Sequence, residues 1–375
     1  MSPDIPFIRP SLPETAAVAA AYERIVEANW FTNFGPTERE LARLMAEAVG
    51  PHHHTSTFAN ATLALVGALS GALGRGDGTR FVLVPSFTFA AGPQAVVWSG
   101  HRVAFVDVDP VTWQPDAAHA RALLETVPGE VAGILLGNTL GVGNAAVAEW
   151  ERLAADHDLP LVIDSAAGFG SWYDDERRVG DAGTCEVFSL HVTKPFGIGE
   201  GGAVLSRDAE LVAWLDRFQN FGFSPGREAE ILGLNGKLPE LSAAIGLLQL
   251  ERLEGRLAER RRVLATYVAE LAPLGLTPLP NSERAALGSA SLRARDPGQR
   301  DQILAALTAA GVQARAYYNP PVHRHPWFVE HDDVWAGGAL PATEALCSEV
   351  LSLPIHDEMS EADLGRVIEA VQSCR

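Results

Sequence analysis

The sequence predicts an α/β protein with a mostly parallel central sheet sandwiched by helices, followed by a smaller α+β domain at the C-terminus. Three observations support this fold class. Short apolar runs alternate with helical stretches between residues 61 and 206, and runs that are apolar at every position are typical of parallel strands buried on both faces. A long helical stretch extends from Pro239 to about Ala272. The 375 residues are also more than a single hydrophobic core usually accommodates.

The individual elements follow from local patterns. Asn60 is expected to cap the small-residue helix Ala61–Leu73, because its side-chain oxygen can accept a hydrogen bond from the first turn. Further helices are expected over Ala90–Trp98 and Val147–His157. Strands are expected at Phe81–Pro85, Val103–Val108, Val131–Leu136, Leu161–Asp164, Val187–Leu190 and Gly202–Ser206.

Two domains are expected. A large α/β domain would occupy residues 1–250, and a linking helix with a small α+β domain would occupy residues 251–375. The N-terminal segment, up to about residue 20, would pack on the small domain.

Composition argues against several classes of function. The formal net charge of -18 argues against nucleic-acid binding, because such binding needs a basic face that neutralises phosphates. The three cysteines are far apart and show neither a disulfide framework nor zinc-ligand spacing. His52–His54 has no partner ligand at suitable spacing, so no metal site is expected. Without a membrane-length apolar run or a signal-peptide pattern, we expect a soluble, cytoplasmic protein with no membrane partner.

Lysines are scarce, which narrows the search for a reactive amine. Only two of the 29 basic residues are lysines, Lys194 and Lys237. Lys194 follows a predicted strand in a glycine-rich loop, where a flat ligand can approach closely. Partial desolvation there would lower its pKa and favour formation of a Schiff base. The alternative is a solvated loop lysine without a chemical role.

Two further features complement this lysine. Asp164 ends a predicted strand, where a carboxylate can pair with a pyridine nitrogen and keep it protonated; alternatively, it caps the next turn. The start of the helix at Ala61 and Thr62 can bind an anion, although many helix starts bind nothing. Together these groups are what pyridoxal 5'-phosphate (PLP) requires: a phosphate seat, an acid for the ring nitrogen and an amine for the aldehyde.

These residues lie in segments that resemble the nucleotide-sugar aminotransferases of the DegT/DnrJ/StrS group, which are PLP enzymes of fold type I (aspartate aminotransferase-like). The resemblance covers nearly the whole chain. The spacing of five residues from Ser189 to Lys194, followed by Gly-Glu-Gly-Gly at 199–202, is specific to this family. The other matching segments are Asn33–Pro36, Asn60–Leu65, Pro85–Phe89, Phe105–Pro110, Asp164–Ala167, Asn220–Gly222, Gly233–Asn235, Glu240–Ala244 and Tyr317–His323.

The resemblance implies roles in binding the cofactor. Lys194 would carry PLP as a Schiff base and later move protons. Asp164 would pair with the pyridine nitrogen, and Phe89 would stack on the ring. The phosphate would be held by Ala61, Thr62 and Ser189.

It also implies contacts with a partner subunit and a substrate. Asn235 would reach the phosphate bound by the neighbouring subunit, so that a homodimer shares its active sites. Phe34, Tyr317 and His323 would contact the substrate, with a packing role equally open for His323.

One position departs from the family pattern. Many members have Gln or His where this sequence has Ala167, beside the phenolic oxygen of the cofactor. Either another group supplies this contact, with Asn138 as a candidate, or the cofactor has one hydrogen bond fewer. Lys237 stands where the family often has arginine, which keeps the charge but loses a bidentate contact.

The implied reaction is a ping-pong transamination. L-glutamate would leave its amino group on the cofactor as pyridoxamine 5'-phosphate (PMP), which would then aminate a nucleotide-linked keto-deoxysugar. Residues 29–36 and 60–63 look most like members that aminate C4 of a dTDP-4-keto-6-deoxyhexose, with C3 amination as the alternative. A PLP- or PMP-dependent sugar dehydratase would have histidine in place of Lys194. A catalytically silent regulator would bind PLP or a sugar nucleotide without turnover.

Overall fold

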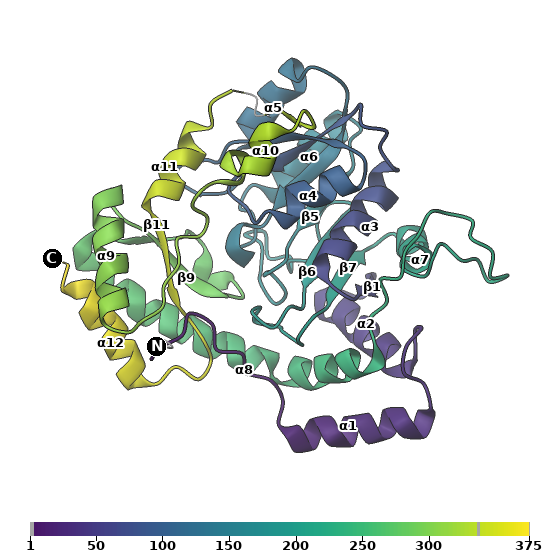
Figure 1. Cartoon of the computed structure of the whole chain (residues 1–375), viewed down its shortest axis with the longest axis horizontal. Helices are drawn as coiled ribbons and strands as arrows, with labels where there is room; N and C mark the ends of the chain where they lie inside the picture. The colour runs from purple at the N-terminus through teal and green to yellow at the C-terminus, as the bar shows by residue number, and fades with distance from the viewer. Residues whose placement is uncertain (1–3, 336–337, 375) are drawn as a thin grey trace.

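The computed structural model describes residues 4–335 and 338–374, which form a large and a small sheet flanked by helices (Figure 1). The large sheet has the strand order β1-β7-β6-β5-β4-β2-β3-β10. Six of its strands are parallel: β2 (Phe81–Pro85), β3 (Arg102–Val106), β4 (Val131–Gly137), β5 (Leu161–Asp164), β6 (Cys185–Ser189) and β10 (Val334–Trp335). At one edge, β7 (Gly202–Ser206) is antiparallel to β6, and β1 (His54–Phe58) is antiparallel to β7.

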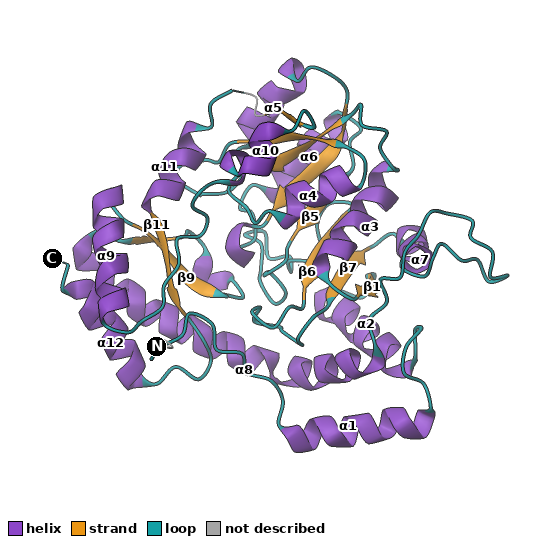
Figure 2. Cartoon of the chain, in the orientation of Figure 1, coloured by secondary structure: helices purple, strands orange, loops and turns teal. Residues whose placement is uncertain are grey.

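Helices cover both faces of this sheet, because its strands carry apolar side chains on both sides (Figure 2). In β5, Val162 packs on one face and Ile163 on the other. The Val162 face is covered by α3 (Ala61–Leu73), α4 (Ala91–Trp98) and α7 (Ala209–Phe218). The Ile163 face is covered by α2 (Pro36–Val49), α5 (Ala117–Thr126), α6 (Val147–Asp156) and the first part of α8 (Glu240–Leu271).

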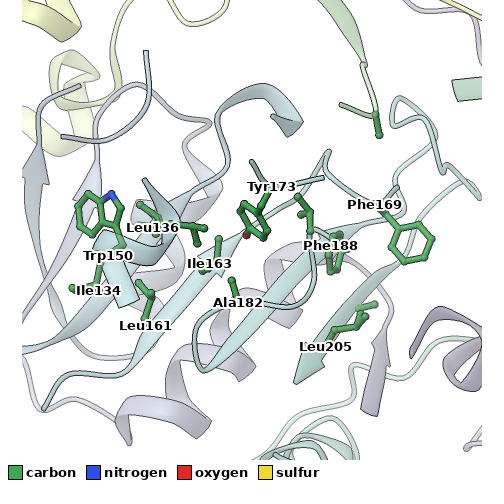
Figure 3. Packing of buried hydrophobic residues seen from close by; sticks show 14 of the residues in the cluster. Ile134, Leu136, Trp150, Leu161, Ile163, Phe169, Tyr173, Ala182, Phe188 and Leu205 are labelled. Atoms are coloured by element: carbon green, nitrogen blue, oxygen red, sulfur yellow. The ribbon is translucent and has the colours of Figure 1, made fainter. Parts of the chain in front are cut away.

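Figure 3 shows the second of these faces from close by. Trp150 of α6 lies beside Ile134 and Leu161 of the sheet, while Phe188 of β6 lies near Phe169. The predicted α/β class with a mostly parallel, helix-covered sheet is confirmed.

Helix α8 connects the two sheets. Leu253 and Leu257 near its middle belong to the core of the large sheet, and Leu264 and Tyr267 nearer its end belong to a separate core around the small sheet. The small sheet has the antiparallel order β11 (Val350–Pro354), β9 (Ser289–Arg293), β8 (Thr277–Pro278). It is accompanied by α9 (Pro297–Ala309), α11 (Pro341–Glu349) and α12 (Glu361–Gln372).

The predicted domain division stays a prediction, and three features bear on it. Residue 250 lies inside α8, so the division would cross a continuous helix. Strand β10, from the C-terminal part of the chain, pairs with β3 of the large sheet. Ile5 of the N-terminal segment belongs to the core around the small sheet and forms a bridge with Val312.

The remaining helices are peripheral: α1 (Thr15–Ala28), which lies along α8, and the short α10 (Pro326–Glu330) (Figure 1). Short 3-10 turns occur at Thr139–Gly141, Ala272–Leu274, Ser282–Arg284 and Val322–Arg324. Among the described residues, no helix has both the length and the apolar character needed to cross a membrane.

Candidate active site

The carboxyl ends of two neighbouring strands bring Asp164 and Ser189 to the same edge of the large sheet. Asp164 ends β5 and Ser189 ends β6. The Asp164 side chain accepts a hydrogen bond from the backbone N–H of Ala166 at 3.1 Å. Burial raises the pKa of Asp164, whereas this hydrogen bond and the Lys194 ammonium group act in the opposite direction. Asp164 is therefore a partly buried carboxyl group whose ionised form a nearby positive charge stabilises.

Lys194 lies in the loop between β6 and β7, and this loop folds back on itself. The N–H of Ile198 donates to the carbonyl oxygen of Leu190 at 2.8 Å. A β-carbon on Gly197 would stand 2.9 to 3.0 Å from three carbonyl oxygens of the loop, that of Lys194 included. Glycine is thus required at 197, because a side chain there would force the backbone that carries Lys194 to move.

The environment of Lys194 favours its neutral, nucleophilic form. The residue keeps partial contact with solvent, but enough protein surrounds the ammonium group that burial lowers its pKa. The Asp164 carboxylate opposes this lowering of the Lys194 pKa without reversing it. A lysine with a lowered pKa can attack an aldehyde at neutral pH, which is the setting predicted from the sequence.

Helix α3 begins beside the end of β6. In the sheet register, Gly202 of β7 is the partner of Ser189. A β-carbon on Gly202 would stand 2.6 to 2.7 Å from backbone atoms of Asn60 and Ala61. The absence of a side chain at Gly202 therefore lets the start of α3 lie directly against the sheet, next to Ser189.

This arrangement gathers donors for an anion. The Asn60 side chain accepts the N–H of Leu63 at 3.0 Å, as the predicted cap requires. The earlier N–H groups, those of Ala61 and Thr62, have no acceptor within the helix. Together with Ser189, whose register partner Gly202 lies against the start of this helix, these donors suit a phosphate group.

Phe89 adds an accessible aromatic ring just after β2. Its side chain is 65% exposed, whereas Phe87, two residues earlier, is only 1% exposed. An exposed ring at the same edge of the sheet can stack on a flat ligand. The residues present therefore fit PLP: donors for its phosphate, an amine for its aldehyde, a carboxylate for its ring nitrogen and an aromatic surface for its ring.

The structure places His323 in a packed environment. Its Nδ1 is 2.6 Å from the Ser86 hydroxyl oxygen, and its Nε2 is 3.2 Å from the Glu344 carboxylate. The residue is 8% exposed, and burial lowers the pKa of its ring. A substrate contact would require one of these partners to leave, so the packing role is the one that the geometry favours. The substrate role stays a prediction.

The other predicted substrate and partner residues are more accessible. Phe34 is half-buried, and the Arg39 guanidinium group lies 4.6 Å from the centre of its ring. Tyr317 stacks on Tyr318, with ring centres 5.5 Å apart. Asn235 is exposed, in the segment that joins α7 to α8. Their roles stay predictions.

Tyr318 is a residue that the sequence analysis missed. It lies close enough to Asp164 that the carboxylate, after burial, is the main cause of the raised pKa of the Tyr318 phenol. Its ring meets Phe87 edge-on, with centres 5.4 Å apart. The only signal for it in the sequence is its position beside Tyr317 in a segment that matches the family.

The side chain of Asn138, the candidate for the contact missing at Ala167, is already hydrogen-bonded within the fold. The amide nitrogen of Asn138 donates to the hydroxyl oxygens of Ser165 at 2.8 Å and Tyr173 at 2.9 Å. Its carbonyl oxygen accepts the N–H of Asn144 at 2.9 Å. Because both of its amide hydrogens are already engaged, Asn138 has no donor left for a ligand.

In the histidine tract at His52–His54, the middle residue has a partner within the fold. His53 is buried, and its Nε2 lies 2.9 Å from the Asp181 carboxylate. Within residues 4–335 and 338–374, no three His, Cys, Asp or Glu side chains are grouped so that they could hold a metal ion.

Comparison with known proteins agrees with this geometry. The model of the DegT/DnrJ/EryC1/StrS aminotransferase family matches residues 14–372. Protein Rv3402c of Mycobacterium tuberculosis (strain ATCC 25618 / H37Rv) is 49% identical over 370 residues, which are 99% of this chain and 90% of that protein. The dTDP-4-amino-4,6-dideoxy-D-glucose transaminase of Escherichia coli is 28% identical over 363 residues, or 95% of each chain. The structure of DesI in the presence of its TDP-sugar product has a TM-score of 0.87 and 32% identity, covering 98% of this chain and 91% of DesI. The predicted resemblance is confirmed.

Proposed function

The chain belongs to the DegT/DnrJ/EryC1/StrS aminotransferase family, and from this premise we propose that it transfers the amino group of L-glutamate to C4 of a dTDP-linked 4-keto-6-deoxyhexose. Membership makes the chain a PLP-dependent sugar aminotransferase. Two relatives support the finer choice: one is named for a dTDP-linked sugar aminated at C4, and the other is described with a TDP-sugar product.

The observation that carries the proposal is the placement of Lys194 and Asp164 within electrostatic reach of each other at the edge of the sheet. When bound, PLP accepts an amino group at its aldehyde carbon and withdraws electrons from the substrate carbon through its ring. Lys194 would bind the aldehyde carbon and, once released, would move a proton between Cα of the donor and C4' of the cofactor. Asp164 would hold the proton on the ring nitrogen.

The remaining residues bind and orient. The start of α3 and the Ser189 hydroxyl would fix the phosphate, and Phe89 would lie on one face of the ring. Because the phosphate seat and the amine come from different elements, the ring would be held at both ends. The donor and the sugar would then bind on the side of Tyr317, which stacks on Tyr318 near Asp164.

We also propose a homodimer with shared active sites. The segment after α7 extends away from the body of the chain (Figure 1). The exposed Asn235 lies near the base of this segment, where it pairs with Asn220. Large apolar side chains are exposed in this segment and near α1, which is typical of an interaction surface. These side chains are Tyr22, Val26, Trp30, Phe31, Phe221, Phe223 and Leu232.

A half-reaction screen tests the proposed substrate. The protein in its PMP form is mixed with a panel of keto-sugar nucleotides, and the return of the absorbance of the PLP form is recorded. We expect return with dTDP-4-keto-6-deoxyglucose and formation of a 4-amino sugar. Return only with 3-keto sugars would contradict C4 amination.

The same panel separates the remaining alternatives. Release of a deoxygenated keto-sugar without an amino sugar would identify a dehydratase. Ligand binding without return of absorbance for any member would favour a silent regulator. Omitting L-glutamate, or replacing it with other amino acids, in the first half-reaction tests the donor separately.

A further inference from the structure

Glu186 is the second residue of β6 and carries a buried carboxyl group, with 0% exposure. One of its oxygens, Oε1, accepts three hydrogen bonds: from the Tyr173 hydroxyl at 3.0 Å, from the N–H of Gly180 at 2.7 Å and from the N–H of Ala182 at 3.0 Å. The other oxygen accepts the hydroxyl of Ser165. A buried charged group needs such partners, but the partners of Glu186 also have a specific location.

The partners of Glu186 lie on the face of the sheet opposite the proposed acid of the site. Figure 3 shows Tyr173 on the face of the sheet that carries Ile163, one residue before Asp164. Glu186 is the register partner of Ile163, and Asp164 is that of Val187. Successive side chains of a strand point to opposite faces. Glu186 therefore lies on the face opposite the Asp164 side chain, separated from it by one residue position.

Ser165 connects the two carboxyl groups. It follows Asp164 in the chain and precedes Ala166, whose N–H binds the Asp164 carboxylate. Its backbone N–H donates to the carbonyl oxygen of Val187 at 2.9 Å, while its hydroxyl donates to Glu186. The residue between Asp164 and its hydrogen-bond donor is thus fixed to β6 by both backbone and side chain.

The neighbouring strand is tied into the same network. The N–H of Asn138, just after β4, donates to the carbonyl oxygen of Asp164 at 3.0 Å. The Asn138 side chain donates to Ser165 and Tyr173, which both donate to Glu186. The ends of β4, β5 and β6 therefore meet at one buried carboxylate.

We propose that Glu186 is a positioning residue for transamination, which acts through Ser165 to fix the orientation of the Asp164 carboxyl group toward the ring nitrogen of the cofactor. The inference rests on the proposed role of Asp164. Glu186 itself touches neither substrate nor cofactor. If Glu186 served only to stabilise the fold, loss of its hydrogen bond from Ser165 or from Tyr173 should affect the ring nitrogen equally. If Glu186 positions Asp164, only loss of the Ser165 hydrogen bond should affect the ring nitrogen.

A matched pair of variants separates these two roles. Ser165→Ala and Tyr173→Phe each remove one hydroxyl that donates to Glu186, but only Ser165 adjoins Asp164. The holoenzyme is loaded with PLP labelled with 15N at the ring nitrogen, and its 15N resonance is recorded. Asp164→Asn provides the signal of a ring nitrogen that has lost its acid partner.

We expect Ser165→Ala to move the resonance part of the way from wild type toward Asp164→Asn, and Tyr173→Phe to leave it at the wild-type position. The rate of the half-reaction with L-glutamate should fall by about tenfold to a hundredfold in Ser165→Ala only. Cofactor affinity should be unchanged in both, because the phosphate seat at α3 is separate.

Three results would overturn the inference: no shift in Ser165→Ala, an equal shift in both variants, or no shift in Asp164→Asn. In the third case the proposed role of Asp164 fails as well, so the two failures are distinguishable. Glu186→Gln, which keeps the shape of the side chain, should reproduce the Ser165→Ala shift. Glu38→Gln serves as its control, because Glu38 is also a buried carboxyl group but is bonded to Thr57 of β1, and two strands lie between β1 and β5.

Discussion

A β-carbon on Gly202 would stand 2.7 Å from the backbone nitrogen of Ala61, so strand β7 and the start of helix α3 touch at these two residues. Gly202 is at the same time the register partner of Ser189. The missing side chain thus lets the start of α3 lie against the residue that pairs with Ser189. The proposed phosphate seat depends on this contact, which gives a direct test.

Gly202→Ala should weaken cofactor binding by about tenfold or more, because relieving a backbone overlap of this kind costs about 1 to 3 kcal/mol. Titration of the apoprotein with PLP, followed by fluorescence, measures the affinity. Gly255→Ala is the control, since nothing lies within 4 Å of a β-carbon at that position in α8. Equal affinities for wild type and Gly202→Ala would place the phosphate elsewhere.

Borohydride reduction of the holoenzyme should fix the cofactor to Lys194. Burial lowers the pKa of both lysines, but only Lys194 lies within electrostatic reach of Asp164. The amine of Lys237 instead donates to the Asn220 side chain at 2.9 Å in the segment after α7. Peptide mapping after proteolysis identifies the modified residue. Lys194→Ala should abolish transamination and still bind PMP through the phosphate seat. An adduct on Lys237, or on neither lysine, would refute the assignment.

Asp164→Asn should keep cofactor binding and lower the rate of transamination by about a hundredfold to a thousandfold, because a neutral amide cannot hold the proton on the ring nitrogen. Single-turnover kinetics with L-glutamate measure the rate, and PLP content measures binding. Turnover close to that of wild type would mean that Asp164 serves only as a cap for the Ala166 N–H.

Two inactive variants should complement each other if the subunits share active sites. Lys194→Ala removes the amine, and Asn235→Asp would bring a carboxylate next to the phosphate of the partner subunit, where like charges repel. In a mixed dimer, one site carries both defects and the other carries neither. After dissociation and mixing, activity should recover to about a quarter of wild type, since about half of the dimers are mixed. No recovery above the parent variants would mean that Asn235 acts within its own chain or that no site is shared.

The contribution of Glu186 to stability should depend on pH. Burial raises its pKa to about 7, against hydrogen bonds from Ser165, Tyr173 and two backbone N–H groups that lower it. Glu186 therefore binds its proton more tightly in the folded state than in the unfolded state. The stability that this bound proton gives to the folded state is lost as pH rises from about 4.5 to about 7. Tyr173 and Cys185 beside it have raised pKa values of their own and stay neutral across this range.

Glu186→Gln removes this titration. The free energy of unfolding of wild type minus that of the variant should therefore fall by up to about 3 kcal/mol between pH 5 and pH 8. Urea denaturation at several pH values measures it. A difference that stays constant with pH, or rises, would contradict a raised pKa for Glu186.

Much of the fold and part of the site were predictable because their signals are local. The six predicted strands lie within a few residues of observed strands, because an apolar run, or a turn that contains glycine, shows where a strand begins or ends. Lys194 and Asp164 were identifiable from residue type and position after a strand. The short strands β1 and β10 were not predicted, because β1 has a polar sequence and β10 is only a two-residue pair formed with a distant strand.

By itself, the sequence determined the α/β class, the family and the cofactor, because each follows from patterns within short segments of the chain. It also predicted the residues that would react with the cofactor. The tertiary structure alone decided that His323 packs against Ser86, that Tyr318 lies near Asp164 and that Asn138 is already occupied. It also decided that the Ser165 hydroxyl donates a hydrogen bond to Glu186. These relationships join residues that are far apart in the chain or on different strands. Burial and hydrogen-bond partners at such distances are fixed only when the strands pair and the helices pack against them.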